Sequence, residues 1–402
     1  ISIWIGDDYR TPSGSAGDPG STDGPAASRV LALGPEHRGK ALTRSVVDVT
    51  GPVEVQLEGR YPAGDPLTHV AGRVDSKHGL DPKSLTELTD SLTWACPEGH
   101  WKLFSFAVRP VDDRVDYLRT ETVARFVETT YEPYVERFGN DIAGFSFDSP
   151  HLTSDPIPWT ESLPAQFAEL KGYDLLPLLP MLVVRAGPET TKLRCDFYDT
   201  LATLYTDAWF AQISSWCEAR GVTWTGHTEE HLAAHPARQA DYFRTMRQVS
   251  LPASDMHGFR NSRPRNVQPA EIKLAVSVAA LTKRPRVAVQ AFGGSGWSTT
   301  LDDVRRGLNR LAILGVDLPV IQSFHYSMDR AESADDWPNT FFTQNPYWRH
   351  FGELTNYAAR LASLVHHSRA ATSIGVLAPL TSVWANTADG RPNTRAQEVS
   401  DS

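Results

Sequence analysis

Residues 285–297 read P-R-V-A-V-Q-A-F-G-G-S-G-W, and this stretch decides how the rest of the sequence is interpreted. The β-branched run at 287–289 predicts a short buried strand. The strand ends on the polar residue Gln290 and opens into a glycine-rich turn that Trp297 closes. A buried strand followed by a polar and then an aromatic side chain is typical of a parallel barrel, in which ligand-contacting residues stand at the carboxyl ends of the strands.

Other segments repeat this arrangement. Apolar runs followed by polar or aromatic residues predict strands at 1–5, 142–147, 222–225, 249–253, 286–290, 316–321 and 374–377. Helical spacing of apolar residues predicts helices at 117–138, 162–171, 190–220, 268–282, 301–314 and 346–367. Strands that alternate with helices imply a parallel sheet with helical crossovers. We therefore predict an α/β fold, a (β/α)₈ TIM-type barrel whose first strand lies upstream of Ile1.

The rival interpretation is an open doubly wound sheet. We disfavour it because no glycine-rich dinucleotide fingerprint follows an early strand. Residues 46–112 have a different sequence pattern. Apolar and polar residues alternate in V-E-V-Q-L-E, and further strand-like runs follow between turn residues. The predicted organisation is a barrel start at 1–45, a small β-rich insertion at 46–112, the remainder of the barrel at 113–384 and a polar tail at 385–402.

The composition excludes several classes of function. The chain has 402 residues, of which 41% are hydrophobic and 22% charged, and a net charge of -9 with no dense basic stripe, so nucleic acid is not an expected partner. No apolar run approaches the roughly 20 residues that span a bilayer. The three cysteines lack metal-ligand spacing and indicate no disulfide framework. The chain opens directly on a strand without Met, so we expect a truncated N-terminus and leave localisation open.

Ionisable side chains gather at several predicted strand exits. Glu229 and Glu230, with His227 beside them, follow the strand at 222–225 and form the densest cluster, which suits acid or base chemistry or a loop of solvated charges. Asp148 follows the strand at 142–147 and suits a catalytic role, a metal-ligand role or a loop cap.

Adjacent side chains diverge, so at most one of Asp7 and Asp8 is expected to face a pocket, and both also suit a turn. The remaining candidates are substrate contacts at later strand exits: Asp255, His257, Gln290, Trp297, His325 and Tyr326. An indole can stack on the C–H face of a sugar ring, and His325 and Tyr326 can donate to hydroxyl groups, although each of these three equally suits a structural role.

Several blocks, taken in order, resemble one enzyme family. They are W-I-G-D-D-Y-R-T-P-S-G-S-A-G at 4–17, F-V-E-T-T-Y-E-P-Y-V-E-R-F-G at 126–139, W-T-E-S-L-P-A-Q-F-A-E-L-K-G-Y-D-L-L-P-L-L-P at 159–180, T-G-H-T-E-E at 225–230, A-F-G-G-S-G-W at 291–297 and N-P-Y-W-R-H-F-G-E-L-T-N-Y-A-A-R-L at 345–361. Together they resemble glycoside hydrolase family 106 and relatives, the α-L-rhamnosidase-like barrel glycosidases. The resemblance implies a barrel with a β insertion and further domains downstream, a carbohydrate substrate, an inverting mechanism and room for a Ca²⁺ cofactor. It would suit a secreted, periplasmic or cytoplasmic bacterial enzyme.

The chain also departs from the family pattern at three strand exits. Asp7-Asp8 stands where relatives tend to show Asp-Glu, Asp148-Ser149-Pro150 where they show Asp-Glu-Pro, and Gln290 where they show a glutamate. An amide keeps the shape of a carboxyl group but cannot exchange a proton at neutral pH. The pocket has therefore lost three of the glutamates that the resemblance implies.

Two hypotheses of function follow. Glycoside hydrolysis needs two carboxyl groups, and the candidates are Glu229 or Glu230 for one role and Asp148, Asp8 or Asp255 for the other. The first hypothesis is thus an α-L-rhamnosidase-like hydrolase of a terminal glycosidic bond. The second is a catalytically impaired barrel that serves as a carbohydrate-binding module. An isomerase or lyase is a weaker idea, because the sequence lacks metal-ligand clustering.

Overall fold

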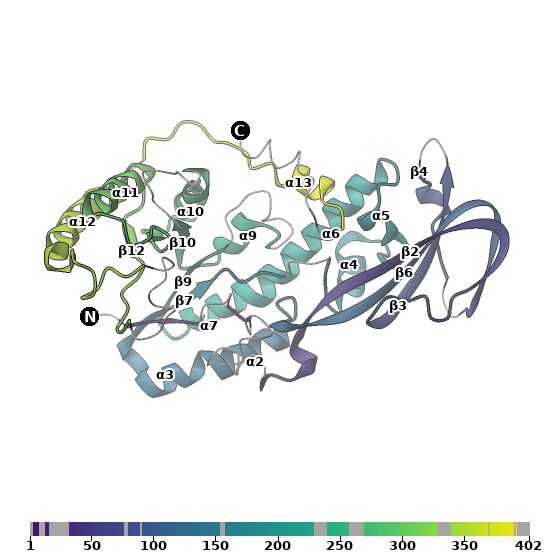
Figure 1. Ribbon diagram of the computed structural model, residues 1–402, viewed down its shortest axis with the longest axis horizontal. Helices are drawn as coiled ribbons and strands as arrows, with labels where there is room; N and C mark the ends of the chain where they lie inside the picture. The colour runs from purple at the N-terminus through teal and green to yellow at the C-terminus, as the bar shows by residue number, and fades with distance from the viewer. Residues whose placement is uncertain are drawn as a thin grey trace.

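The computed structural model describes residues 3–7, 13–15, 32–75, 79–88, 91–152, 157–228, 239–256, 269–328, 339–368, 370–389 and 391. Within these residues the chain forms two sheets, one parallel and one antiparallel. Helix α6 (Glu189–Tyr205) runs between the region of the parallel sheet and the long antiparallel ribbon (Figure 1).

The parallel sheet has six strands in the order β1-β7-β9-β10-β11-β12. Their bounds are β1 (Ile3–Gly6), β7 (Ile142–Asp148), β9 (Thr223–His227), β10 (Leu251–Met256), β11 (Ala288–Ala291) and β12 (Leu318–Ile321). Every neighbouring pair runs parallel, as the predicted alternation of strands and helices requires. The result is a mixed α/β fold with a curled half-barrel sheet, and β1 and β12 form its edges in the described part of the chain.

Six of the seven predicted strands are present, and the prediction of a strand at 374–377 is wrong. Residues 370–379 form neither helix nor strand. Ile374 is 78% exposed, and Val376 and Leu377 are each 92% exposed. An apolar run indicates that its side chains are buried, but it does not indicate which element buries them. Among the described residues, this run pairs with no strand of either sheet.

The helices follow the predicted spacing with one break. The predicted helix at 117–138 is divided at Tyr131, because Pro133 lies in the first turn of α3 and has no N–H to continue the preceding helix. The helix bounds are α2 (Thr120–Thr130), α3 (Glu132–Phe138), α4 (Leu163–Lys171), α5 (Pro180–Val183), α7 (Gln212–Glu218), α9 (Tyr242–Met246), α10 (Pro269–Thr282), α11 (Leu301–Leu314), α12 (Phe351–His366) and α13 (Leu380–Asn386). A π-helical segment, Thr206–Ala211, joins α6 to α7. Among the described residues, no helix has the length and apolarity that a bilayer crossing needs.

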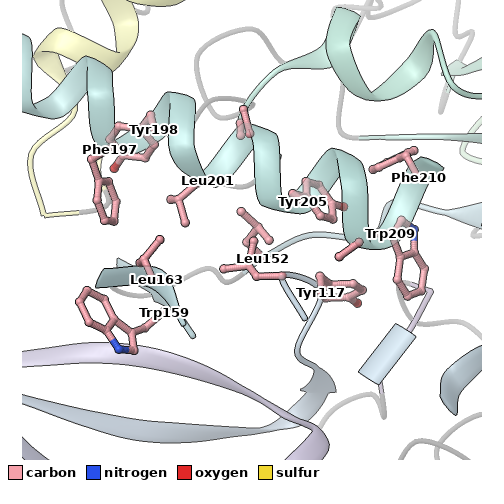
Figure 2. Packing of buried hydrophobic residues seen from close by; sticks show 14 of the residues in the cluster. Tyr117, Leu152, Trp159, Leu163, Phe197, Tyr198, Leu201, Tyr205, Trp209 and Phe210 are labelled. Carbon is pink, nitrogen blue, oxygen red and sulfur yellow. The ribbon is translucent and has the colours of Figure 1, made fainter. Parts of the chain in front are cut away.

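The main hydrophobic core surrounds α6 and includes side chains of the parallel sheet, such as Phe147, and of the antiparallel sheet, such as Phe106. Figure 2 shows Tyr117, Tyr205 and Trp209 close together beside α6, and the ring centroids of Tyr117 and Trp209 are 4.8 Å apart. By contrast, the other face of the sheet carries only a small cluster of Leu251, Ala253 and Ala288 with the partly buried Leu318. Most of the large buried side chains therefore sit on the helix side, while the opposite face carries few apolar side chains, among them the partly exposed Trp4.

The antiparallel sheet has the order β4-β3-β6-β2-β8, with β5 paired to β3. Its strands are β2 (Arg38–Gln56), β3 (Asp65–Asp75), β4 (Gly79–Leu80), β5 (Thr86–Glu87), β6 (Thr93–Val115) and β8 (Ile157–Trp159). They extend on both sides of the range 46–112 in which the β insertion was predicted. Because β8 follows β7 closely and pairs with β2, the sheet is connected to the exit of β7.

Asp116 lies where the long ribbon returns to the helices. Asp116 is 4% exposed, and its carboxyl group accepts hydrogen bonds from the Leu118 N–H at 3.0 Å and from the Thr160 hydroxyl at 2.7 Å. Burial, opposed by these two bonds and by the charges of Lys40 and Arg119, raises the pKa of Asp116 from 3.8 to about 6. The site thus favours the protonated carboxyl.

We predict that Asp116 makes folding stability fall with rising pH. The folded pKa exceeds the unfolded one, so the folded protein binds more protons between about pH 4 and pH 6, and the free energy of unfolding drops by about 3 kcal/mol across that window. Asp116→Asn removes this contribution. Urea unfolding at intervals from pH 4 to 7 measures it, with Asp48→Asn, whose side chain is 80% exposed, as the control. If the free energy of unfolding changed with pH in the same way in the wild type and in Asp116→Asn, the prediction would be contradicted.

Candidate functional site

Polar side chains at the carboxyl ends of the strands share one face of the parallel sheet. Residues aligned across parallel strands point to the same side. Asp148 is aligned with His227, and Asp255 is aligned with Gln290. The alignment of β9 with β10 puts both pairs on the same face, since side chains alternate along each strand. It is the face that carries small residues such as Ala253.

At the exit of β7, a carboxylate, an imidazole and a hydroxyl group lie in contact. The Asp148 side chain is 37% exposed, and its Oδ1 lies 3.5 Å from Nε2 of the buried His227. The other ring nitrogen of His227, Nδ1, lies 3.3 Å from Oγ of Ser149, and the Ser149 N–H donates to the His227 carbonyl at 2.9 Å. Ser149 has φ 37°, so the chain turns sharply after the strand. These contacts fix the ring and leave the carboxylate accessible.

Asp7 lies buried behind this exit and holds it in place. Its Oδ1 accepts from the Ser13 hydroxyl, and its Oδ2 accepts from the Tyr131 hydroxyl at 2.6 Å. Oγ of Ser13 accepts from the Asp148 N–H at 2.7 Å, and the Ser13 N–H donates to the Asp148 carbonyl at 2.7 Å. Asp7 therefore positions the backbone of Asp148.

Tyr131 completes this buried cluster. Besides donating to Asp7, its hydroxyl accepts from Nε1 of Trp224 at 3.2 Å. Burial and then the nearby charge of Asp7 raise the pKa of Tyr131 well above its usual value of 10. The phenol consequently stays neutral and remains a donor.

The exits of β10 and β11 differ in accessibility. Asp255 is 5% exposed and interacts with other protein groups. Gln290 is partly exposed, and its Nε2 donates to Oε1 of Gln322, just beyond β12, at 2.9 Å. The predicted substrate contact Gln290 is thus one half of a pair of amides.

The loop after β12 is fixed by backbone contacts. The His325 N–H donates to the Thr340 hydroxyl at 3.0 Å, and the His325 carbonyl accepts from Nε2 of Gln344 at 3.2 Å. The Tyr326 ring stands in solvent, 95% exposed, while Trp297 is partly buried and contacts other groups. Asp148, Ser149 and His227 are therefore brought together, and Tyr326 stands apart.

Four predicted site residues lie outside the described residues: Asp8, Glu229, Glu230 and His257. The two glutamates directly follow His227 and the buried Thr228 in the chain. Three residues that the sequence did not single out belong to the site: Ser13, Tyr131 and Gln322. Gln290 was selected because it is a polar residue at the end of a predicted strand, and the same criterion could have selected Gln322. No local sequence signal marks Ser13 or Tyr131.

The described residues contain no group of three or more His, Cys, Asp or Glu side chains arranged to hold a metal ion. The calcium cofactor stays a prediction from resemblance. A cavity of about 520 Å³ lies elsewhere, lined by Asp317, Leu318 and residues of α12. It is at the amino end of β12, away from the strand exits. There, Nδ1 of His366 lies 2.9 Å from Asp317.

A family model identifies the family, and two further comparisons find glycosidases. Residues 58–398 match the model of glycoside hydrolase family 106, described as alpha-L-rhamnosidase. A solved structure, the rhamnosidase from Novosphingobium sp. PP1Y, has a TM-score of 0.55 and 22% identity, covering 76% of this chain and 31% of its own. A protein of Formosa agariphila named "Putative beta-glucuronidase" is 25% identical over 149 residues, which is 33% of this chain and 13% of that protein. The matches thus span less than a third of either relative.

We predict that Tyr131→Phe destabilises the protein by about 2–3 kcal/mol. The change leaves the buried Asp7 carboxylate without one charge-assisted donor and Trp224 without its acceptor. Urea unfolding measures the free energy difference, and Tyr326→Phe, at a ring 95% exposed, should stay within about 0.5 kcal/mol of wild type. Equal stability of Tyr131→Phe and wild type would show that Asp7 does not depend on this hydroxyl.

Proposed function

Since the chain belongs to glycoside hydrolase family 106, we propose that the full-length protein hydrolyses a terminal α-L-rhamnosyl or related deoxyhexosyl bond at the carboxyl end of its parallel sheet. The observation that carries the proposal is Asp148. Its carboxylate is accessible, its backbone is held through Ser13, and a buried imidazole lies 3.5 Å away. An ionisable group on a rigid strand end is what proton transfer requires.

The proposed reaction uses two carboxyl groups. Asp148 supplies one, and Glu229 or Glu230, next to His227 in the chain, supplies the other. One protonates the leaving oxygen while the other activates water, which adds to the anomeric carbon from the opposite side and inverts its configuration. His227 orients Asp148, and Ser149 orients His227. Gln290, partly exposed on the same face, is then proposed as a substrate contact, and the buried Asp255 beside it as a residue that supports Gln290.

We further propose that the parallel sheet is part of a (β/α)₈ barrel in the full-length protein. The exposed apolar residues on its two edges support this. Ile3 and Trp4 of β1 are 44% and 41% exposed, and Val320 of β12 is 46% exposed. Parallel strands normally have both faces and both neighbours covered, so additional strands between β12 and β1 would bury these side chains.

A carbohydrate-binding module is the second candidate function. It is favoured by the polar groups that stand beside Asp148 and at the exit of β11, a serine hydroxyl and an amide respectively. Neither group can supply or take up a proton at neutral pH. Both can bind sugar hydroxyls, so recognition without cleavage is chemically consistent with these residues.

We predict that Asp148→Asn in the full-length protein lowers kcat on an aryl α-L-rhamnoside by at least about 100-fold, because the amide cannot exchange a proton. Glu229→Gln and Glu230→Gln, made singly, should identify the second group by a similar loss in one of them. Initial rates across a panel of aryl glycosides measure the effect. The anomer formed first, followed by proton NMR, should have the inverted configuration.

The matched control is Asp48→Asn, an exposed carboxylate on the antiparallel sheet, which should retain full activity. Full activity of Asp148→Asn would remove that residue from the reaction. Retention of configuration would reject the inverting mechanism. Saccharide binding by the wild type with no hydrolysis of any glycoside in the panel would favour the binding module.

A further inference from the structure

Two primary amides meet at the carboxyl ends of β11 and β12. Nε2 of Gln290 donates to Oε1 of Gln322 at 2.9 Å. The backbone supports this contact, because the Gln322 N–H donates to the Ala291 carbonyl at 2.9 Å and so continues the pairing of the two strands. Both side chains are partly exposed. The pair is therefore fixed by the sheet and reachable from solvent.

The turn after β11 leaves space for the Gln322 amide. A Cβ atom at Gly293 would lie 2.1 Å from Oε1 and 2.8 Å from Cδ of Gln322, so any larger residue would displace the amide. Phe292, the preceding residue, is fully buried and has φ 74°, a conformation that is costly for a bulky side chain. The chain tolerates backbone strain where it passes this amide.

The pair retains unused hydrogen-bonding capacity. Its internal bond uses one N–H of Gln290 and one lone pair of Gln322. In the described part of the chain, neither Oε1 of Gln290 nor Nε2 of Gln322 has a protein partner. The pair thus offers one amide oxygen and one NH₂ group side by side. Reversing the internal bond would leave the same two groups, so the property does not depend on which glutamine donates.

We propose that Gln290 and Gln322 together bind two adjacent hydroxyl groups of the sugar ring. Oε1 of Gln290 accepts from one hydroxyl, and Nε2 of Gln322 donates to the next. Each hydroxyl can donate and accept, so a vicinal diol matches the pair. Gln322 is then a specificity-determining residue, because a site built to bond a hydroxyl discriminates against an analogue that lacks it. This inference rests on the proposed function only in taking a glycoside as the ligand.

The first test pairs Gln322→Met with deoxy sugars. Methyl α-L-rhamnoside and its 2-, 3- and 4-deoxy analogues are titrated calorimetrically into full-length protein that carries Asp148→Asn to suppress turnover. Gln322→Met should weaken binding of the parent glycoside about tenfold, the effect of one lost hydrogen bond. One deoxy analogue, the one that lacks the hydroxyl group contacted by Gln322, should bind equally well to the Asp148→Asn protein with and without Gln322→Met. Gln56→Met, at an exposed position on β2, is the control.

The second test displaces the amide without removing it. Gly293→Ala should weaken binding as much as Gln322→Ala does, and the two changes together should weaken it no further, because the three atoms nearest the added methyl group all belong to Gln322. Circular dichroism and thermal unfolding verify that each variant is folded. Additive effects of Gly293→Ala and Gln322→Ala would overturn the inference.

The remaining outcomes separate this inference from the proposed function. Unchanged affinity of Gln322→Met for the parent glycoside and all three analogues would overturn the inference while leaving hydrolysis intact. Suppose that the wild type hydrolyses no glycoside, but that Gln322→Met weakens binding of the parent glycoside and not of one deoxy analogue. This result would support the inference and overturn the proposed hydrolase function. Absence of any saccharide binding in every variant and in the wild type would overturn the inference as well.

Discussion

The exit of β7 depends on one buried carboxylate, that of Asp7. Removing a charge from water is costly unless it is hydrogen-bonded, and the hydroxyl groups of Ser13 and Tyr131 supply those bonds. Ser13 then holds Asp148 at both its N–H and its carbonyl. Three segments far apart in the sequence thereby fix the position of the accessible carboxylate, and the cost of burying Asp7 is offset only while all three stay together.

Elements with local signals were predictable from the sequence. Helix α11 matches its predicted bounds because Thr300 and Asp303 form a capping box at its start and Gly315 ends it in the left-handed conformation. The segment at 374–377 had only an apolar run, without a cap, a turn or a partner. Burial of such a run depends on what packs against it, which is a tertiary property that no local pattern contains.

The candidate site was predictable in outline, because polar residues that follow parallel strands gather at one edge. Which of those residues have accessible side chains was not predictable, since this depends on strand register and on the turn beyond the strand. Register aligns Asp255 with Gln290, yet Asp255 is buried and Gln290 is partly exposed. Likewise the turn after β12 brings Gln322 against Gln290, while the more conspicuous Tyr326 stands in solvent.

The antiparallel sheet contributes to the same site through the segment that follows Asp148. Strand β8 pairs with β2, and the guanidinium of the buried Arg114, near the end of β6, donates to the His151 carbonyl at 3.4 Å. The segment between β7 and β8 is therefore anchored at both ends, by the parallel sheet on one side and by the long ribbon on the other. The two sheets are thus connected through the segment that directly follows the accessible carboxylate of Asp148.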